Sequence, residues 1–185
     1  APIFFKQAKY TLLDQNTFWL CEKPDSVGMV GWDAALTRIA TWVKLQDKKT
    51  GQILMVVNTH FDHIGTEARR NSALLIIEKI KEIVGTSPAI LTGDFNVSED
   101  WDAYKTITNN EFILKDAHKV AGKRTGVDFT YHNFGKIPAE KCEKIDFIFV
   151  TPQIRVISSY IPFSQLNDTL FLSDHNPEIV ELEIK

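Results

Sequence analysis

The sequence predicts a single strand-rich domain of the α/β (α+β) class over residues 1–185. Its 185 residues, 44% of them hydrophobic, are enough for one substantial core. Short apolar runs rich in β-branched residues recur along the chain, and one long segment has the period of a helix. No internal repeat, linker or low-complexity tract interrupts the pattern, so we expect one domain.

Strands are predicted wherever a short apolar run is bounded by turn residues. The runs IFFK and YTLLDQNTFWL open the chain, and LTRIATWVKLQ and ILMVVNTHF flank the turn-like segment DKKTGQ. The second pair therefore predicts a β-hairpin. Later strands are predicted at AILTGDF, KIDFIFV, IRVISSYI and PEIVELEI.

One long helix is predicted over residues 66–84, where Thr66 can cap the first turn and Gly85 can end the last. Its apolar positions recur at helical spacing, namely Ala73, Leu74, Ile77, Ile80 and Val84.

The middle of the chain is less regular. A short helix begun by Ser98 is expected over residues 98–108. Residues 119–143 are rich in Gly, Lys and polar residues and predict a long loop of the kind that borders functional sites.

The charge balance and the cysteines narrow the function class. The formal net charge is −3, from 24 acidic and 21 basic residues, which does not favour a basic protein that coats nucleic acid. Cys21 and Cys142 lack the paired spacing of a zinc site, so we expect two buried free thiols. No apolar run reaches the length of a membrane span. The sequence predicts a soluble chain and leaves its compartment unknown, because any export signal would lie outside these residues.

Polar side chains cluster at the ends of four predicted strands. One such group alone is typical of an ordinary turn, but four together indicate a site for a metal ion and a phosphate. Asp146 is the sharpest case, because it interrupts an apolar strand where an unpaired carboxylate is costly to bury. It needs a partner, and a histidine is a good one. The groups are Asn58, His60, Asp62 and His63; Asp94 and Asn96; Asp146; and Asp174 and His175.

Four motifs carry a family resemblance. The segments NTHFDH, LTGDFN, KIDFIFV and LSDHNP, in that order and at those separations, resemble the endonuclease/exonuclease/phosphatase superfamily, which includes deoxyribonuclease I. The segment GWDAALTRIATWVKL resembles an uncharacterised bacterial branch of it. The resemblance implies a two-sheet β-sandwich flanked by helices, with the site at one end. It also implies hydrolysis of a phosphoester assisted by Mg²⁺ or Mn²⁺.

The resemblance also implies roles for residues at the motif positions. Asp94 resembles the carboxylate that orients or deprotonates the attacking water, and a metal ligand. Asn96 resembles the amide that holds the phosphate or that water. His175 resembles the imidazole that faces the phosphate, and Asp146 the carboxylate that fixes its tautomer. Asp174 resembles a metal ligand, or a residue that hydrogen-bonds to a metal ligand.

Two further residues complete the expected site. His60 resembles a second histidine that donates to the phosphate or the leaving group. Arg38 lies near the position where some nucleases of the family hold a phosphate with arginine, although a surface arginine on a strand fits the sequence nearly as well.

Other polar and aromatic residues favour structural roles. Solvated positions are expected for the pairs Asp62 and His63, and Arg69 and Arg70. Lys123 and Arg124 in the expected loop have the charge to attract an anionic substrate, but two positive charges do not make a nucleic-acid patch. Trp32 and Trp101 have the chemistry to stack on a base or sugar, but packing under a loop is commoner.

One family feature is not visible in the sequence. Members of the family begin with a strand carrying an Asn and then a QE-like motif whose Glu is the main metal ligand. This chain opens at APIFFKQAKY, which resembles the middle of a member. We therefore expect an N-terminally truncated chain, or a missing segment supplied as a separate chain. Glu22 and Glu67 are substitutes by residue type alone.

Two functions follow from these observations. The first is a divalent-metal-dependent phosphoesterase acting on a phosphodiester or phosphomonoester. Its substrate would be nucleic acid, a phospholipid headgroup or a small phosphoester. The second is a non-catalytic phosphate-binding or scaffold module that lacks the metal-ligand Glu. Retention of the phosphate-facing residues favours the first.

Overall fold

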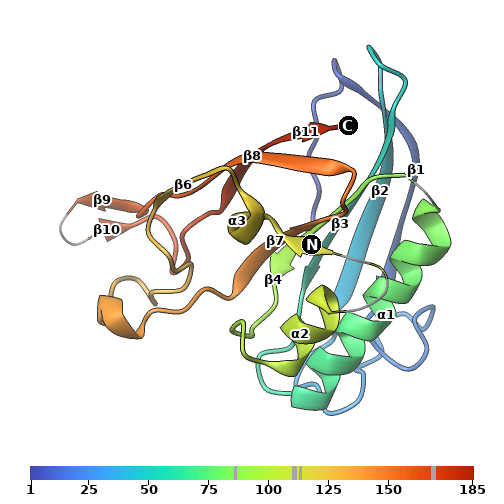
Figure 1. The fold of residues 1–185 in the computed structure, drawn as a ribbon. Coiled ribbons are helices and arrows are strands. Elements are labelled where there is room, and N and C mark those ends of the chain that lie inside the picture. The colour runs from blue at the N-terminus through green and yellow to red at the C-terminus, as the bar shows by residue number, and fades with distance from the viewer. Residues whose placement is uncertain (86, 110–111, 113, 168–169) are drawn as a thin grey trace.

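Two β-sheets packed face to face form the protein, with two helices on the outer side of the larger sheet (Figure 1). The computed structural model describes residues 1–185 except 86, 110–111, 113 and 168–169. The larger sheet has six strands in the order β1-β2-β3-β4-β7-β5. These are β1 (Tyr10–Trp19), β2 (Ile39–Asp47), β3 (Ile53–His60), β4 (Ala89–Asp94), β7 (Asp146–Val150) and β5 (Lys115–Asp116).

The smaller sheet has three strands in the order β11-β8-β6. These are β11 (Ile179–Ile184), β8 (Ile154–Ile161) and β6 (Lys123–Gly126). A two-stranded ribbon of β9 (Gln165–Asn167) and β10 (Leu170–Phe171) projects beyond it (Figure 1). The predicted two-sheet sandwich is therefore confirmed, and so is the hairpin of β2 and β3.

Two apolar clusters hold these layers together. The first joins the larger sheet to α1 (Thr66–Val84) and α2 (Asp102–Thr108), which lie side by side on its outer face (Figure 1). Its centre is aromatic, and Phe61, Phe95, Phe147 and Phe149 are at most 1% exposed. The second cluster lies between the two sheets and contains Leu54, Ile90, Val150, Ile154 and Val156. Burial of these side chains is the main favourable contribution to folding.

The helix over residues 66–84 forms as predicted, but a distant side chain caps it. Gly65 occupies the cap position, and the Thr66 side chain does not cap the first turn. Instead, the carboxylate of Asp33 accepts hydrogen bonds from the backbone N–H groups of Glu67 (3.2 Å) and Ala68 (2.7 Å). A Cβ on Gly65 would lie 2.6 Å from that carboxylate, so this close approach requires glycine. The apolar stripe is also shifted, because Leu74 is 50% exposed.

Three other local predictions were wrong. The IFFK run is not a strand, although the neighbouring YTLLDQNTFWL run forms β1. Ser98 does not begin the second helix, which starts at Asp102, because the Ser98 hydroxyl bonds to Glu143 (3.0 Å). The expected loop at 119–143 contains the end of α3 (Ala117–Val120), β6 and the 3₁₀ helix η1 (Ala139–Lys141).

The cysteines and the helices fit the sequence expectations in part. Cys21 and Cys142 are both free, but only Cys21 is fully buried. Among the described residues, no helix combines the length and the apolar character needed to cross a bilayer.

Candidate functional site

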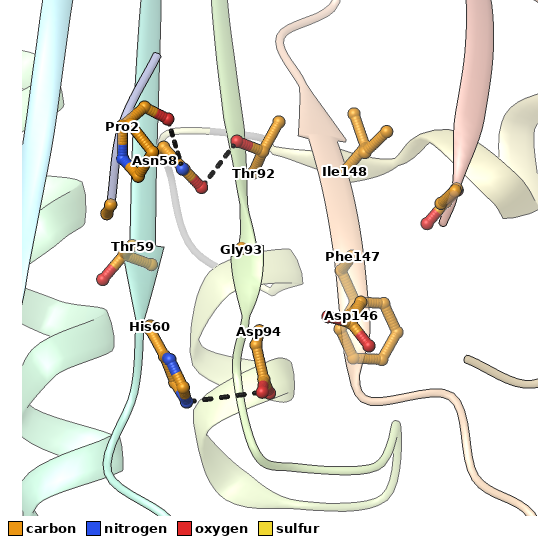
Figure 2. Close-up of a pocket in the computed structure, with 12 residues that line it drawn as sticks. Pro2, Asn58, Thr59, His60, Thr92, Gly93, Asp94, Asp146, Phe147 and Ile148 are labelled. Atoms are coloured by element: carbon orange, nitrogen blue, oxygen red, sulfur yellow. Dashed lines mark hydrogen bonds and ion pairs between the residues drawn. The ribbon is translucent and has the colours of Figure 1, made fainter. Parts of the chain in front are cut away.

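Three neighbouring strands place a polar side chain at the same edge of the larger sheet. β3 and β4 are parallel and end side by side, with His60 opposite Asp94 in the register. β7 is antiparallel to β4 and begins at that edge, with Asp146 opposite Asp94. Figure 2 shows these three side chains in a row. The topology therefore converts three distant sequence motifs into one cluster.

A glycine makes this close strand packing possible. Gly93 has a φ of 159°, and a Cβ at its position would lie 2.3 Å from the backbone oxygen of Thr59 on β3. Only glycine fits there without displacing the strand. The Gly in GDFN thus fixes the lateral position of Asp94 against His60.

His175 reaches the cluster from the loop before β11. Its Nδ1 lies 2.7 Å from a carboxylate oxygen of Asp146, and its Nε2 lies 4.0 Å from Asp94. Because an ionised carboxylate only accepts hydrogen bonds, Nδ1 must donate, and Nε2 is turned toward Asp94. The rings of Tyr131 and His175 have centroids 5.0 Å apart. The backbones of the same two residues form an isolated antiparallel β-bridge. Asp146 therefore has the histidine partner that its place in the strand requires.

The close charges set the protonation of the cluster. The hydrogen bond that His175 donates to Asp146 raises the pKa of His175 and outweighs the effect of burial. Burial, followed by the charge of Asp146, raises the pKa of Asp94 to about 6. Burial and the nearby Arg38 lower the pKa of His60, whose Nε2 lies 3.4 Å from Asp94. Asp94 therefore ionises close to neutral pH, next to one histidine that favours the cation and one that favours the neutral form.

Asn96 ties the strand-end loops together. Its φ of 50° is left-handed, a conformation that Asn tolerates better than most residues. Its backbone N–H donates to Asp94 (2.9 Å), and its side-chain amide donates to the backbone oxygen of Phe61 (3.0 Å). The structure thus places Asn96 beside Asp94, with one amide hydrogen already bonded to the protein.

Arg38 lies next to the cluster and is held by two neighbours. Its Nε lies 3.4 Å from Asp62, and its Nη2 lies 3.1 Å from Nδ1 of His63. Its positive charge lowers the pKa of both His60 and Asp94, so it adds to the positive field around the site.

The expectation of a solvated Asp62 was wrong. Asp62 is 1% exposed and accepts hydrogen bonds from the backbone N–H groups of Leu36 (3.1 Å), Ile64 (2.9 Å) and Gly65 (2.8 Å). Burial alone would raise its pKa, but these bonds outweigh burial and hold the pKa well below its usual range. Asp62 therefore organises the loop between β3 and α1. The bonds to Ile64 and Gly65 form a local turn of the kind that Asp favours, so Asp62 before Gly65 was an available signal for it. The bond to Leu36, 26 residues away, has no signal in the sequence.

Asp174, predicted with Asp94 as a metal ligand, does not belong to the close group of candidate ligand atoms. Among the described residues, the group whose ligand atoms lie within 4.8 Å of one another is Asp94, Asp146 and His175. Asp174 instead bonds to the Ser173 hydroxyl through its side chain (3.3 Å) and to the His132 N–H through its backbone oxygen (3.0 Å).

The donor set of the cluster fits a divalent cation. Asp94 and Asp146 are neighbouring carboxylates, and the charge of Asp146 helps to raise the pKa of Asp94. A hard cation prefers carboxylate oxygens and would relieve this repulsion.

Sequence reasoning missed a buried ion pair beside the cluster, whose acidic member, Glu178, lines the same cavity as Asp94 and Asp146. Nζ of Lys144 lies 2.8 Å from Glu178, and their side chains are 6% and 3% exposed. The same Nζ donates to the backbone oxygen of Asp146 (2.7 Å). The pair therefore connects the residues just before β7 to the segment that follows His175. A Lys at the start of the KIDFIFV run was the available signal, but an exposed strand end explains it equally well.

A cavity of about 510 Å³ opens in front of the row. His60, Asp94 and Asp146 line one end of it (Figure 2). Further along the strands, Asn58 lines it too, donating to the backbone oxygen of Pro2 (2.9 Å) and accepting from the Thr92 hydroxyl (3.1 Å).

Solved structures from Bacteroides resemble this fold closely. An endonuclease/exonuclease/phosphatase from Bacteroides vulgatus is 63% identical with a TM-score of 0.94, and the match covers 98% of this chain and 69% of that one. A mannosyl-6-phosphatase from Bacteroides thetaiotaomicron is 34% identical with a TM-score of 0.88, covering 97% of this chain and 69% of that one.

A viral relative and a family profile extend the comparison. The chain is 30% identical over 175 residues to an uncharacterised protein of Acanthamoeba polyphaga mimivirus. That match covers 89% of this chain and 63% of the relative, so the chain spans less than two thirds of the relative's length. The sequence profile described as "Endonuclease/Exonuclease/phosphatase family" matches residues 6–175, a range that includes His60, Asp94, Asp146 and His175. The chain therefore belongs to the endonuclease/exonuclease/phosphatase family.

Proposed function

We propose that this chain hydrolyses a phosphoester, either a phosphodiester or a phosphomonoester, by activating a water molecule with the help of a divalent metal ion. The observation that supports it most is the His175–Asp146 pair, 2.7 Å apart, beside a second carboxylate whose pKa is raised to about 6. Paired acid and base groups held at one edge of a sheet are typical of hydrolytic sites.

Asp94 acts on the attacking water. Its carboxylate is ionised above about pH 6 and can orient the water or accept its proton. The backbone N–H of Asn96 bonds to one carboxylate oxygen and so fixes the orientation of the other.

His175 acts on the phosphate. Because Asp146 holds its Nδ1, the imidazole presents Nε2 to the same side as Asp94. Its raised pKa favours the imidazolium form, which can donate to a phosphate oxygen on which negative charge develops. His60 and Arg38 add donors and positive charge from the neighbouring strands.

Asp94 and Asp146 are the residues that would hold Mg²⁺ or Mn²⁺. When bound, the ion would act as a Lewis acid that stabilises negative charge on the phosphate oxygens. The related mannosyl-6-phosphatase supports a phosphomonoester as one substrate class.

A non-catalytic phosphate-binding module is the second candidate. The observation that favours it is the small ligand set: within the described part of the chain, the cluster offers two carboxylates, and one is already bonded to His175. Mg²⁺ prefers six oxygen ligands.

Hydrolysis of p-nitrophenyl phosphate and bis-p-nitrophenyl phosphate, with Mg²⁺, Mn²⁺ or EDTA, tests these functions. We expect metal-dependent turnover that falls about 10²–10⁴-fold in His175→Ala and in Asp94→Ala, as is typical for a lost acid, base or electrostatic stabiliser. The exposed Asp25 offers a control, and Asp25→Ala should leave turnover unchanged. A folded chain that binds phosphate without hydrolysing either ester would support the binding module instead.

A further inference from the structure

A second pocket lies between the start of α1 and the loop that leads into α2. Its volume is about 270 Å³. The two helices lie side by side, so the pocket is built on well-packed elements (Figure 1). Its main lining residues are Thr66, Arg69, Val97, Asp100, Trp101 and Asp102.

The pocket contains a buried guanidinium with hydrogen-bonding capacity left over. Arg69 is 4% exposed, which overturns the expectation of a solvated helix face. Its Nη1 donates to the backbone oxygen of Asp62 (3.0 Å) and its Nη2 to the Thr66 hydroxyl (3.3 Å). Nε has no hydrogen-bond partner, and no ion pair within 4.0 Å is formed with a carboxylate of the described residues. Two of five N–H groups are thus bonded, both to neutral acceptors.

The rim of the pocket has the opposite chemistry. Asp100 and Asp102 are exposed carboxylates, which only accept hydrogen bonds. Trp101 is 41% exposed, and the guanidinium carbon of Arg69 lies 4.9 Å from the centroid of the Trp101 ring. The pocket therefore combines donors, acceptors and an aromatic surface.

A neutral polyol suits this combination better than an anion does. Each hydroxyl of a sugar can donate to a carboxylate and accept from a guanidinium, and its C–H groups can pack on an indole. A second phosphate would gain from Arg69 but would be repelled by both Asp100 and Asp102.

The pocket shares its loops with the phosphoester site. Val97, which lines the pocket, follows Asn96, and Arg69 bonds to the backbone of Asp62, two residues after His60. A ligand with a phosphate and a polyol part is therefore the kind of molecule that would contact both.

We propose that the pocket of Arg69, Asp100, Trp101 and Asp102 binds the sugar or polyol portion of the substrate whose phosphoester is hydrolysed at Asp94 and His175. This inference rests on the proposed function and specifies its substrate as a phosphorylated sugar or related polyol.

Binding measured by NMR in EDTA, where turnover is suppressed, tests the pocket independently of catalysis. The probes are glucose 6-phosphate, mannose 6-phosphate and inorganic phosphate, followed through the indole N–H of Trp101 and by affinity. We expect at least one hexose phosphate to bind about tenfold more tightly than phosphate, a difference of about 1.4 kcal/mol. Trp101→Ala and Asp100→Asn should each abolish this preference and leave phosphate affinity unchanged. Tyr160→Ala is the control, because Tyr160 is 44% exposed on β8.

Several results would overturn the proposal. Equal affinities for hexose phosphates and phosphate, or no binding of either, would exclude a polyol site, as would a preference that survives both substitutions. Phosphate binding that shifts the Trp101 signal and strengthens in Asp100→Asn would identify an anion site instead. Hydrolysis of p-nitrophenyl phosphate, which has no polyol, reports on the proposed function alone, so the two failures can be told apart.

Discussion

The buried pair of Lys144 and Glu178 allows a sharp prediction about stability. Lys144→Met would leave the Glu178 carboxylate, 3% exposed, without its cation. Breaking a buried ion pair from one side typically costs about 3–5 kcal/mol of unfolding free energy. We expect a loss in that range at pH 7. Burial already raises the pKa of Glu178 above its ordinary value of 4.5, and removal of the Lys144 cation should raise it further. The loss should therefore shrink as the pH falls from 7 toward 4.5, because the carboxyl becomes neutral over that range.

Urea unfolding of the wild type, the two single variants and the double variant Lys144→Met/Glu178→Met measures this cost. The double variant should recover most of the lost stability, because replacing both partners with apolar side chains is often neutral or stabilising by about 1–4 kcal/mol. Arg155 and Glu183 provide a matched control, since they form an ion pair at 3.7 Å with side chains 66% and 59% exposed. Arg155→Met should cost only about 0–1 kcal/mol. If Lys144→Met costs no more than Arg155→Met, the inferred role of the buried pair is wrong.

Three further predictions concern the site. The pKa of Asp94 is raised from 3.8 to about 6, so its favourable contribution is complete below pH 4 and is lost as the pH rises through 6. We therefore compare the unfolding free energy of the wild type and Asp94→Asn in EDTA, measured by denaturant titration at each pH. Between pH 4 and pH 8, the wild type should lose about 2 kcal/mol more than the variant. Curves of unfolding free energy against pH that run parallel for the two proteins would contradict this. Asp146→Asn should lower the pKa of His175 and move the alkaline limb of the pH–rate profile to lower pH, and an unchanged profile would argue against the pairing. Mg²⁺ should raise the melting temperature of the wild type but not of Asp94→Asn, as calorimetry can check.

Much of the fold was predictable because its signals are local. The alternation and length of apolar runs depend on the strand itself. Accordingly, β1, β3, β4, β7, β8 and β11 all lie within predicted runs, and β2 extends one residue beyond its run, to Asp47. The start of α1 was predicted correctly, but its cap was not. Asp33 lies more than 30 residues away from the helix, and no pattern within residues 66–84 refers to it.

The side chains that meet in the candidate site could be predicted to the level of residue type. A carboxylate within the apolar run KIDFIFV was expected to have a histidine partner, and the structure places His175 beside it. Asp146 is nevertheless the first residue of β7 and its side chain is 25% exposed, so the strand does not bury it as the run suggested. The buried positions of Asp62 and Arg69 were not predictable, because both residues look like solvated loop or helix positions in the sequence. Part of their surroundings comes from distant segments: Leu36 donates a backbone N–H to Asp62, and the ring of Trp101 packs on the Arg69 guanidinium.

The sequence by itself determined the longer strands, the main helix and the polar motifs at the strand ends, since each depends on neighbours along the chain. It did not predict the short strands β5, β6, β9 and β10. Only the tertiary structure decided that β3, β4 and β7 align His60, Asp94 and Asp146 in one row, and that His175 meets Asp146 at 2.7 Å. The physical reason is that burial, pKa and hydrogen-bond partners depend on which distant segments pack together. A residue's own sequence context does not contain that information.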